Sequence, residues 1–503
     1  MVGSMGVHSD STLVEETESL RRSVSLGLDG ARQEALGQFL TPAPTASLMA
    51  SMLESTSEDV RLLDPGAGIG SLTAASVVEL LSRPTLPRSI EVIAYEIDPT
   101  MIDGLHLTLK LCAEHCTSRG ITFHSELVES DFLESVANAA TPRFTAAILN
   151  PPYFKIAANS GARAHTRSFG VDVPNAYAAF IVGAMASLET EGELVAITPR
   201  SFCNGTYFRS FRKYLLDSAA LDRVHVFDSR SEVFKESSVL QENIVFHLTK
   251  SSGRPSSVKL TSSSWSGDEL TGDCDVPYGE VIHPDDPERF IHVDPSQDGQ
   301  RSLAVMQSLP ATLSDLGLTV STGPIVDFRA KQHLRATMAK GCVPLIYPTH
   351  LVDHGVSWPK ADSRKPNAIR EDASLMRYLI PDGNYVLVKR FSVKEERRRL
   401  VASVLESGTL GSERIGLENH LNYFHEDGGG LPLTLARGLS LYLNSTIADT
   451  YFRRFSGHTQ VNATDLRNMR YPSRTELIRI GKKVRRGSIV SQARTDVLAA
   501  EFF

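Results

Sequence analysis

Short apolar runs alternate with amphipathic segments through the first half of the chain. The runs, each bounded by polar or turn-forming residues, predict buried strands at about 60–64, 91–98, 121–128, 146–149, 193–199, 224–227 and 243–248. Helical spacing of apolar residues predicts helices at about 25–37, 43–54, 71–81, 99–119, 175–188 and 207–216. Thr41 is expected to be the N-cap of the helix at 43–54, with Pro42 in its first turn. This alternation over roughly 200 residues predicts an α/β domain with a doubly wound, mostly parallel sheet.

The remaining segments predict how the chain is divided. Residues 1–24 are polar and acidic, and we expect them to be loosely attached. Serine, glycine, lysine and aspartate dominate 251–273, which predicts a linker or long connection. We therefore expect the α/β domain to cover 25–252 and a mixed α+β domain to cover 253–503. Aromatic, basic and amide residues interleave in the second domain at 319–333, 385–399, 418–425 and 451–472. These residue types suit phosphate contacts and base-edge readout, although they also occur in any polar fold.

Charged residues are unevenly distributed along the chain of 503 residues. The net charge is −7, and residues 1–250 hold 20 basic and 30 acidic residues, whereas 451–503 hold 11 basic and 4 acidic ones. We therefore expect a polyanionic partner to meet the C-terminal part. The five cysteines form no C-x-x-C pair, which favours a reduced, cytoplasmic setting and argues against a metal site. No apolar run approaches the roughly 20 residues of a membrane span, and we expect no signal peptide.

Acidic residues and glycines follow the first three predicted strands. The first strand ends at Asp64 and enters a loop with Gly66 and Gly68, where the missing side chains let the main chain approach a ligand. The second ends at Glu96, whose carboxylate can accept both hydroxyl hydrogens of a ribose. After the third comes Asp131 beside an aromatic ring, which suits an adenine but is also typical of a helix N-cap. Parallel strands end at one edge of a sheet, so these groups are expected to share one ligand site.

A stiff loop follows the fourth predicted strand, at Asn150-Pro151-Pro152-Tyr153. Neither proline carries an N–H, so the strand must stop there, and Pro152 holds Pro151 in an extended conformation. An amide, a rigid carbonyl and an aromatic ring at the end of a strand are suited to gripping a planar amine. An isolated Asn-Pro-Pro could equally be a strand-ending turn, so the surrounding motifs decide in favour of a site.

With these motifs in this order, the chain resembles the gamma-class DNA N6-adenine methyltransferases. The matching segments are 38–42, 64–70, 96–97, 131–132, 150–153, 177–180, 192–201 and Phe234. The C-terminal half matches less closely and is similar, at 325–329 and 457–462, to the target-recognition regions of type II restriction-modification methylases. Residues 36–52 resemble the PstI type of that group.

The resemblance implies a Rossmann-like methyltransferase sheet, S-adenosylmethionine as cofactor and double-stranded DNA as substrate. The catalytic residues that it implies are Asn150, Pro151, Pro152, Tyr153 and Phe234. The cofactor-binding residues that it implies are Phe39, Thr41, Pro42, Asp64, Gly66, Gly68, Glu96, Ile97, Asp131, Phe132, Asn150 and Phe180. A target-recognition region would occupy 253–503, and a separately encoded restriction endonuclease is a candidate partner of a host-protecting enzyme.

The implied chemistry acts on an adenine that is flipped out of the duplex. The amide oxygen of Asn150 and the carbonyl of Pro151 would accept its two N6 hydrogens. The rings of Tyr153 and Phe234 would stack on the base, which is worth roughly 1–3 kcal/mol for each base stacked. This mechanism needs no metal, because the sulfonium already makes the methyl group electrophilic.

Other functions share parts of this pattern. An N5-glutamine protein methyltransferase and an RNA adenine methyltransferase also use Asn-Pro-Pro-Tyr, but neither requires the long C-terminal region with its basic end. A non-catalytic DNA-specificity subunit would not need the catalytic tetrapeptide or the acids at 64, 96 and 131. A methylase–nuclease fusion is disfavoured because no lysine has an acid two residues before it.

Overall fold

The structure is a computed structural model that describes most of the chain. The described residues are 10–27, 39–137, 143–204, 206–227, 243–251, 253–263, 270–284, 286–293, 305–306, 308–352, 355–361, 364–392, 396–455, 460–484 and 491–502. The chain forms two compact units. The first comprises Met1–Cys203 with Tyr207–Pro295, and the second comprises Asn204–Thr206 with Ser296–Phe503.

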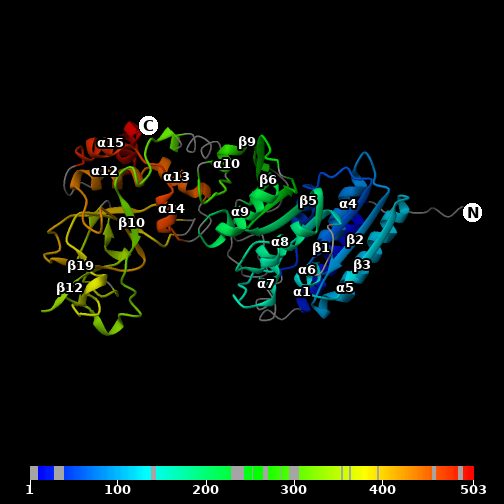
Figure 1. Ribbon diagram of the computed structural model, residues 1–503, viewed down its shortest axis with the longest axis horizontal. Helices are drawn as coiled ribbons and strands as arrows, with labels where there is room; N and C mark the ends of the chain where they lie inside the picture. Colours follow the sequence, from blue (N-terminus) through cyan, green and yellow to red (C-terminus); the bar gives the residue numbers. More distant parts are fainter. Residues whose placement is uncertain are drawn as a thin grey trace, which may run out of the picture. The chain divides into compact units, whose positions relative to one another are not determined.

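Within the described residues, a nine-stranded sheet runs through the first unit in the order β3-β2-β1-β4-β5-β7-β6-β8-β9 (Figure 1). Its strands are β1 (Asp59–Pro65), β2 (Ser89–Tyr95), β3 (Thr122–Val128), β4 (Phe144–Leu149), β5 (Leu188–Pro199), β6 (Ala220–Phe227), β7 (Asn243–Thr249), β8 (Ser257–Ser263) and β9 (Leu270–Pro277). The strands from β3 to β5 are parallel, and β7 lies antiparallel between β5 and β6. The predicted mostly parallel α/β fold is confirmed.

Helices cover both faces of this sheet. One face carries α1 (Asp10–Gly27), α3 (Ala43–Ala50), α4 (Ser71–Ser82) and α5 (Pro99–Ser118), and the other carries α6 (Phe132–Ala137), α7 (Gly161–Ser168), α8 (Ala176–Ser187), α9 (Arg209–Ser218) and α10 (Tyr278–Val281). Strand side chains alternate between the faces, so Ala146 and Ile148 of β4 enter one core while Ala147 and Leu149 enter the other. Because β4 is buried on both faces, its sequence is a continuous apolar run rather than an alternating one.

The predicted loose attachment of the N-terminal segment is wrong for the residues described there. Helix α1 begins at Asp10 and packs on α4, with Leu13, Thr17 and Arg21 on its buried side. Only Leu13 is apolar, and Arg21 is paired with Glu18 at 2.8 Å. The buried face of this helix is therefore mostly polar, and the sequence did not reveal it as buried. The helix predicted at 25–37 lies largely outside the described residues.

The predicted linker at 251–273 is also wrong, because β8 and β9 extend the sheet through it. Thr261 and Ser263 of β8 are buried, and their hydroxyl oxygens lie 2.9 and 3.0 Å from the ring nitrogens of His225 on β6. These contacts satisfy the hydroxyl groups inside the sheet, which explains why a serine-rich segment can form a strand. The first compact unit accordingly reaches Pro295 rather than ending at 252.

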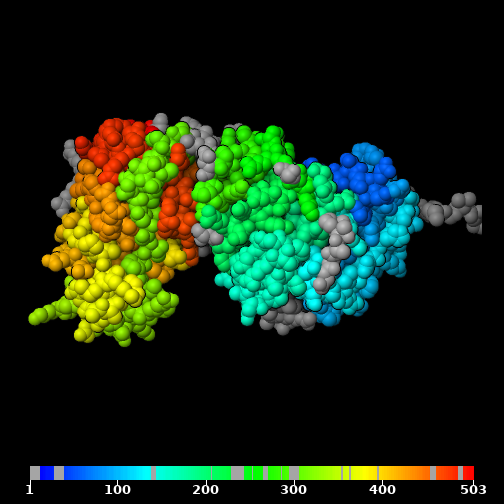
Figure 2. All heavy atoms as spheres, viewed as in Figure 1, coloured from blue at the N-terminus to red at the C-terminus, as the bar shows by residue number. Residues whose placement is uncertain are grey.

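The second unit combines small sheets with helices. Its two larger sheets have the orders β10-β20-β17-β18 and β11-β15-β12-β19-β16. The strands are β10 (Thr319–Thr322), β11 (Leu334–Arg335), β12 (Cys342–Ile346), β13 (Leu351–Val352), β14 (Gly355–Val356), β15 (Ala368–Arg370), β16 (Ile380–Pro381), β17 (Tyr385–Lys389), β18 (Ala402–Leu405), β19 (Arg414–Leu417) and β20 (Leu421–His425). The helices are α12 (Leu433–Leu443), α13 (Thr446–Phe455), α14 (Ala463–Arg467), α15 (Arg474–Gly481) and α16 (Gln492–Ala499). Segments that are distant in sequence share its surface (Figure 2).

Candidate active site

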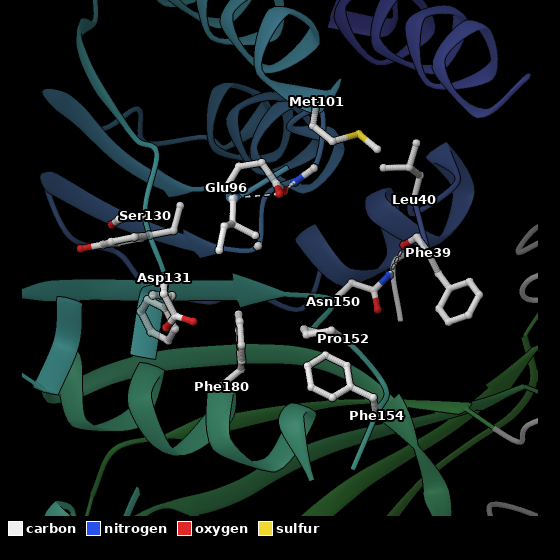
Figure 3. Close-up of a pocket in the computed structure, with 15 residues that line it drawn as sticks. Phe39, Leu40, Glu96, Met101, Ser130, Asp131, Asn150, Pro152, Phe154 and Phe180 are labelled. Carbon is white, nitrogen blue, oxygen red and sulfur yellow. Dashed lines mark hydrogen bonds between the residues drawn. The ribbon is translucent and has the colours of Figure 1, made fainter. Parts of the chain in front are cut away.

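A pocket of about 230 Å³ lies beyond the carboxyl ends of β1, β2 and β4, where ligands bind in open α/β sheets (Figure 3). It is lined by Phe39, Leu40, Gly66, Gly68, Tyr95, Glu96, Ile97, Met101, Ser130, Asp131, Phe132, Asn150, Pro152, Phe154 and Phe180. The acid at the end of β2, the glycines after β1 and the amide after β4 therefore surround one space. The sequence predicts a shared ligand site for these groups, and the structure brings them together around this pocket.

The loop after β1 presents main chain to the pocket rather than side chains. Gly68 has a φ of +58°, a backbone conformation that L residues rarely adopt. A Cβ atom at this position would lie 2.9 Å from Cδ2 of Leu40, so a larger residue would displace that side chain. The N–H of Gly66 donates a hydrogen bond of 2.9 Å to the carbonyl of Tyr95, which holds the loop against the end of β2. Space for a ligand thus depends on glycine here.

Glu96 is fixed at the pocket by backbone donors. Its Oε2 accepts a hydrogen bond of 2.7 Å from the N–H of Gly68, and its Oε1 accepts bonds of 2.8 Å from the N–H groups of Ile97 and Asp98. Burial raises the pKa of the carboxyl although these N–H groups favour its charged form. The acid therefore joins the glycine loop to the strand end, and Oε2, which accepts a single bond, keeps further acceptor capacity.

Aromatic rings form the far end of the pocket. The ring of Phe132 lies 5.4 Å from that of Phe180 and 5.2 Å from that of Tyr95, measured between centroids. Asp131 lines this end, and its Oδ1 also accepts a hydrogen bond of 3.0 Å from the N–H of Glu134 in the first turn of α6. Asp131 therefore caps α6, the alternative role suggested by the sequence, and it also lines the pocket.

Hydrogen bonds orient the amide of Asn150 at the opposite end of the pocket. Its Nδ2 donates to the carbonyl of Phe39 at 2.7 Å and to Oγ1 of Thr41 at 3.0 Å. Its Oδ1 accepts a bond of 3.0 Å from Oη of Tyr153, which lies 3.2 Å from the carbonyl of Ile197. The strand-ending turn thus positions a functional group, since both ends of the amide are engaged and the side chain still lines the pocket.

Comparisons with known proteins decide the family. Residues 112–234 match the model of the Eco57I restriction-modification methylases. The chain is 40% identical over 472 residues to the type II methyltransferase M.PstI of Providencia stuartii, covering 93% of each protein. It is also 40% identical over 460 residues to the type II methyltransferase M.BsuBI of Bacillus subtilis, covering 89% of this chain and 90% of that protein. The chain belongs to this family of type II methyltransferases.

The predicted resemblance to PstI-type restriction-modification methylases is therefore confirmed. Among solved structures, the Type IIL restriction-modification enzyme MmeI in complex with DNA is similar with a TM-score of 0.51 at 12% identity. That match covers 97% of this methyltransferase and 72% of MmeI. At this identity the similarity concerns the fold.

Several predicted site residues of the methyltransferase lie behind the pocket rather than in its lining. Thr41 contacts Asn150, and the N-cap of α3 is Pro42, so the predicted capping role of Thr41 is wrong. Pro151 is buried, and the ring of Tyr153 lies 5.9 Å from that of Phe39. Gln38 and Phe234 lie outside the described residues.

Asp64 is fully buried beneath the glycine loop. Its Oδ2 accepts a hydrogen bond of 2.7 Å from the hydroxyl of Thr73 in α4. Burial raises the pKa of Asp64 to about 7, and the nearby charge of Glu96 adds to the effect. Asp64 is not among the residues that line the pocket, and its side chain is instead bonded to the first turn of α4.

Sequence reasoning missed part of the lining. The missed residues are Leu40, Tyr95, Met101, Ser130 and Phe154. Tyr95, Ser130 and Phe154 each adjoin a predicted motif that follows a strand, and this adjacency was the signal that could have found them. Leu40 and Met101 carry no such signal. Phe154 is the most notable, because 39% of it is exposed immediately after the tetrapeptide.

No described helix combines the length and the apolar character that crossing a membrane requires. Within the same residues, no group of three or more histidine, cysteine, aspartate or glutamate side chains is arranged to hold a metal ion.

Proposed function

We propose that this type II methyltransferase transfers a methyl group from S-adenosylmethionine to N6 of an adenine at a specific sequence in double-stranded DNA. It would thereby protect host DNA against a separately encoded restriction endonuclease. The observation that carries the proposal is the position of Asn150, whose oriented amide lines the same pocket as Gly66 and Gly68.

The residues of the pocket fit S-adenosylmethionine. The carboxylate of Glu96 suits a ribose diol, and the rings of Phe132 and Phe180 suit the faces of an adenine whose amine would meet Asp131. The glycine loop leaves open the volume that a Cβ atom at Gly68 would restrict. When bound, the cofactor supplies an electrophilic methyl group on a positively charged sulfur.

The chain's own contribution is to hold the substrate nitrogen in line with the methyl group. Both Nδ2 hydrogens of Asn150 are donated within the protein, so Oδ1 is the atom that can accept one N6 hydrogen, and the carbonyl of Pro151 would accept the other. Burial raises the pKa of Tyr153, which keeps its hydroxyl protonated as a donor to Asn150. Because both acceptors are neutral, they orient the nitrogen lone pair without first removing a proton, and positioning lowers the barrier.

The target base must leave the duplex to reach this pocket, which costs a few kcal/mol. Stacking on an aromatic ring offsets roughly 1–3 kcal/mol of that cost. Figure 3 shows the ring of Phe154 beside Pro152 on the Asn150 side of the pocket. Phe154 therefore joins Tyr153 and Phe234 as a candidate for contact with the flipped base.

The proposal is tested with tritiated S-adenosylmethionine and three substrates in parallel, namely plasmid DNA, an RNA transcript and a release-factor protein. Label should enter the DNA alone and be recovered as N6-methyladenine. Asn150→Ala should lower the rate by at least roughly 10²-fold, as loss of a key polar group at a reacting centre does, while cofactor binding stays within about threefold. Asn159→Ala is the matched control, because this exposed amide follows the tetrapeptide in the next loop.

Other outcomes would reject the proposal. Label recovered in RNA, in protein or on a cytosine amine would identify a different substrate. Full activity of Asn150→Ala would remove the catalytic assignment.

A further inference from the structure

The four aromatic and polar stretches of the second unit meet at one end of the sheet β10-β20-β17-β18. The register places Thr322, which ends β10, and Val388 of β17 opposite Asn422 near the start of β20. The segments 323–330, 390–392 and 418–420 therefore leave the sheet at the same end. The fourth stretch joins them through Val461, whose carbonyl accepts from Nδ2 of Asn422 at 2.7 Å and whose N–H donates to the carbonyl of Arg390 at 2.6 Å.

Exposed aromatic rings lie in these segments, each with a cation beside it. Phe328 is 71% exposed, and the guanidinium of Arg329 lies 5.5 Å from the centre of its ring. Phe391 is 39% exposed, with the guanidinium of Arg390 at 6.0 Å and the ring of His420 at 4.8 Å. Single exposed apolar side chains are common, but two exposed rings at one end of a sheet, each beside a basic side chain, form a patch that a partner can cover.

Polar groups beside the rings are held in fixed positions. Arg390 donates from Nη1 to the carbonyl of Asn419 at 3.1 Å and from Nη2 to Oε1 of Gln460 at 3.2 Å. The amide of Gln460 is thereby oriented, so its Nε2 is presented as a donor. We call Phe328, Arg329, Arg390, Phe391, His420 and Gln460 the aromatic–basic surface.

The carboxylates nearby are already neutralised. Lys365 lies 3.0 Å from Oδ2 of Asp327, and Nδ1 of His420 is hydrogen-bonded to Glu418, whose side chain is fully buried. Among the described residues, no carboxylate is within ion-pair distance of Arg329. The exposed charge at this surface is therefore positive, which suits an anionic partner.

We propose that the aromatic–basic surface contacts the recognition sequence in duplex DNA and sets the sequence specificity of the proposed methyl transfer, on which this inference rests. Arginine and glutamine are the side chains that read guanine and adenine edges in the major groove, and apolar side chains contact the thymine methyl group. Phosphate contacts alone would need cations but no exposed rings. The joint presence of fixed cations, an oriented amide and open rings thus favours base contact.

The experiment compares surface variants with matched controls in the full chain. The variants are Phe328→Ala, Arg329→Ala and Phe391→Ala. The controls are Val497→Ala and Arg494→Ala on α16, which remove an exposed apolar and an exposed basic side chain elsewhere in the same unit. Sequencing of modified bases in a plasmid exposed to the wild type first identifies the target. Fluorescence anisotropy then measures binding to a short duplex with that target and to a scrambled one.

Each surface variant should bind the target duplex about 5-fold to 150-fold more weakly, which corresponds to loss of a base contact worth roughly 1–3 kcal/mol, and should discriminate less against the scrambled duplex. The controls should bind within about twofold of the wild type, and cofactor affinity should be unchanged throughout. Arg329→Ala is the decisive variant, since that exposed side chain can be removed without disturbing the fold.

Unchanged duplex binding by all three variants would overturn the inference. A loss of self-association in light scattering, with DNA binding intact, would assign the surface to a second copy of the chain and overturn it too. If the wild type modifies no DNA, the same variants are measured on a mixed-sequence duplex. Weakened binding there would uphold the surface while the proposed function fails, whereas a wild type that binds no duplex rejects both.

Discussion

At the scale of single residues, the orientation of one amide determines what the site can do. The two ends of an asparagine side chain have nearly the same shape, and only their hydrogen bonds distinguish them. The carbonyl of Phe39 can accept but never donate, so the atom of Asn150 that lies 2.7 Å from it must be the nitrogen. The oxygen then accepts from the hydroxyl of Tyr153, and on the proposed function its second lone pair would accept a hydrogen of the substrate amine.

Thr41 is a positioning residue for that amide. Thr41→Val keeps the shape of the side chain but removes the acceptor for one Nδ2 hydrogen. The unsatisfied donor costs roughly 1–3 kcal/mol, so we expect kcat to fall by about 5-fold to 100-fold while cofactor KM changes little. Steady-state kinetics with unmethylated target DNA measure both parameters.

Thr41→Ser is the matched control, because it retains the hydroxyl and should restore most of the lost kcat. A role in packing alone would predict the reverse order, with valine active and serine impaired.

Residue chemistry explains which parts of the site could be predicted from the sequence. Gly68, Glu96 and Asn150 each lie at or just after the end of a strand, and the side chain or backbone of each suits a specific ligand contact. Their position and their chemistry therefore both indicated the site. Leu40 and Met101 line the pocket only because a neighbouring segment folds over it. Their apolar side chains are equally at home in any core, which is why sequence alone could not single them out.

At the scale of elements, α12 and α15 pack unusually closely, which Figure 1 shows as adjacent helices of the second unit. A Cβ atom on Gly438 would lie 1.9 Å from the carbonyl oxygen of Leu477, a backbone atom that cannot rotate away. Gly438→Ala should therefore push the helices apart and lower the free energy of unfolding by about 3 kcal/mol, as overpacking does. Denaturant unfolding followed by circular dichroism measures the loss.

Gly355→Ala is the control for this prediction, since a Cβ atom there would meet nothing within 4 Å. Equal midpoints for the two variants would show that the helices have room to separate.

A second test at this scale concerns three neighbouring strands. His247 of β7 lies 2.9 Å from Oε2 of Glu193 on β5 and 3.4 Å from Oδ2 of Asp222 on β6. Burial lowers the pKa of His247, but the two carboxylates outweigh it and raise the pKa to about 9. Protonated His247, held between these two carboxylates, therefore stabilises the fold. This contribution is fully present below the ordinary histidine pKa of about 6.5 and is lost as the pH rises through 9.

We expect the free energy of unfolding to decrease between pH 6.5 and 9.5 by up to roughly 3 kcal/mol from this group. His247→Gln should be less stable at pH 6.5 and should show a flatter profile. Unfolding curves at several pH values measure the difference, and parallel profiles for the two proteins would contradict the linkage.

Elements also differ in how well the sequence predicts them. The strand β4 is apolar throughout because both of its faces are covered, and it was found readily. The helix α1 buries Thr17 and Arg21, and β8 buries Thr261 and Ser263, so polar residues occupy interior positions in both. The partners of Thr17 and Arg21 lie within α1, whereas His225 of another strand satisfies the two hydroxyl groups of β8, and no local pattern reveals such a distant partner in advance.

At the scale of the whole molecule, a net charge of −7 must be reconciled with an anionic substrate. The aromatic–basic surface supplies local attraction that the total conceals. Duplex binding should therefore depend strongly on salt. If on the order of six phosphates are neutralised, affinity should fall by about 10³-fold between 50 and 200 mM salt.

Cofactor affinity measured over the same salt range serves as the comparison and should change far less. A DNA affinity independent of salt would mean that duplex recognition does not rest on these cations.

The pocket end built from Glu96, Phe132 and Phe180 has a consequence for turnover. On the proposed function, these groups hold the nucleoside half of the cofactor, which is chemically identical before and after the methyl group departs. That end would grip spent and fresh cofactor equally, so the choice between them falls to the opposite end, near Phe39 and Leu40. Spent cofactor would then compete with fresh cofactor for the pocket and slow successive cycles as it accumulates.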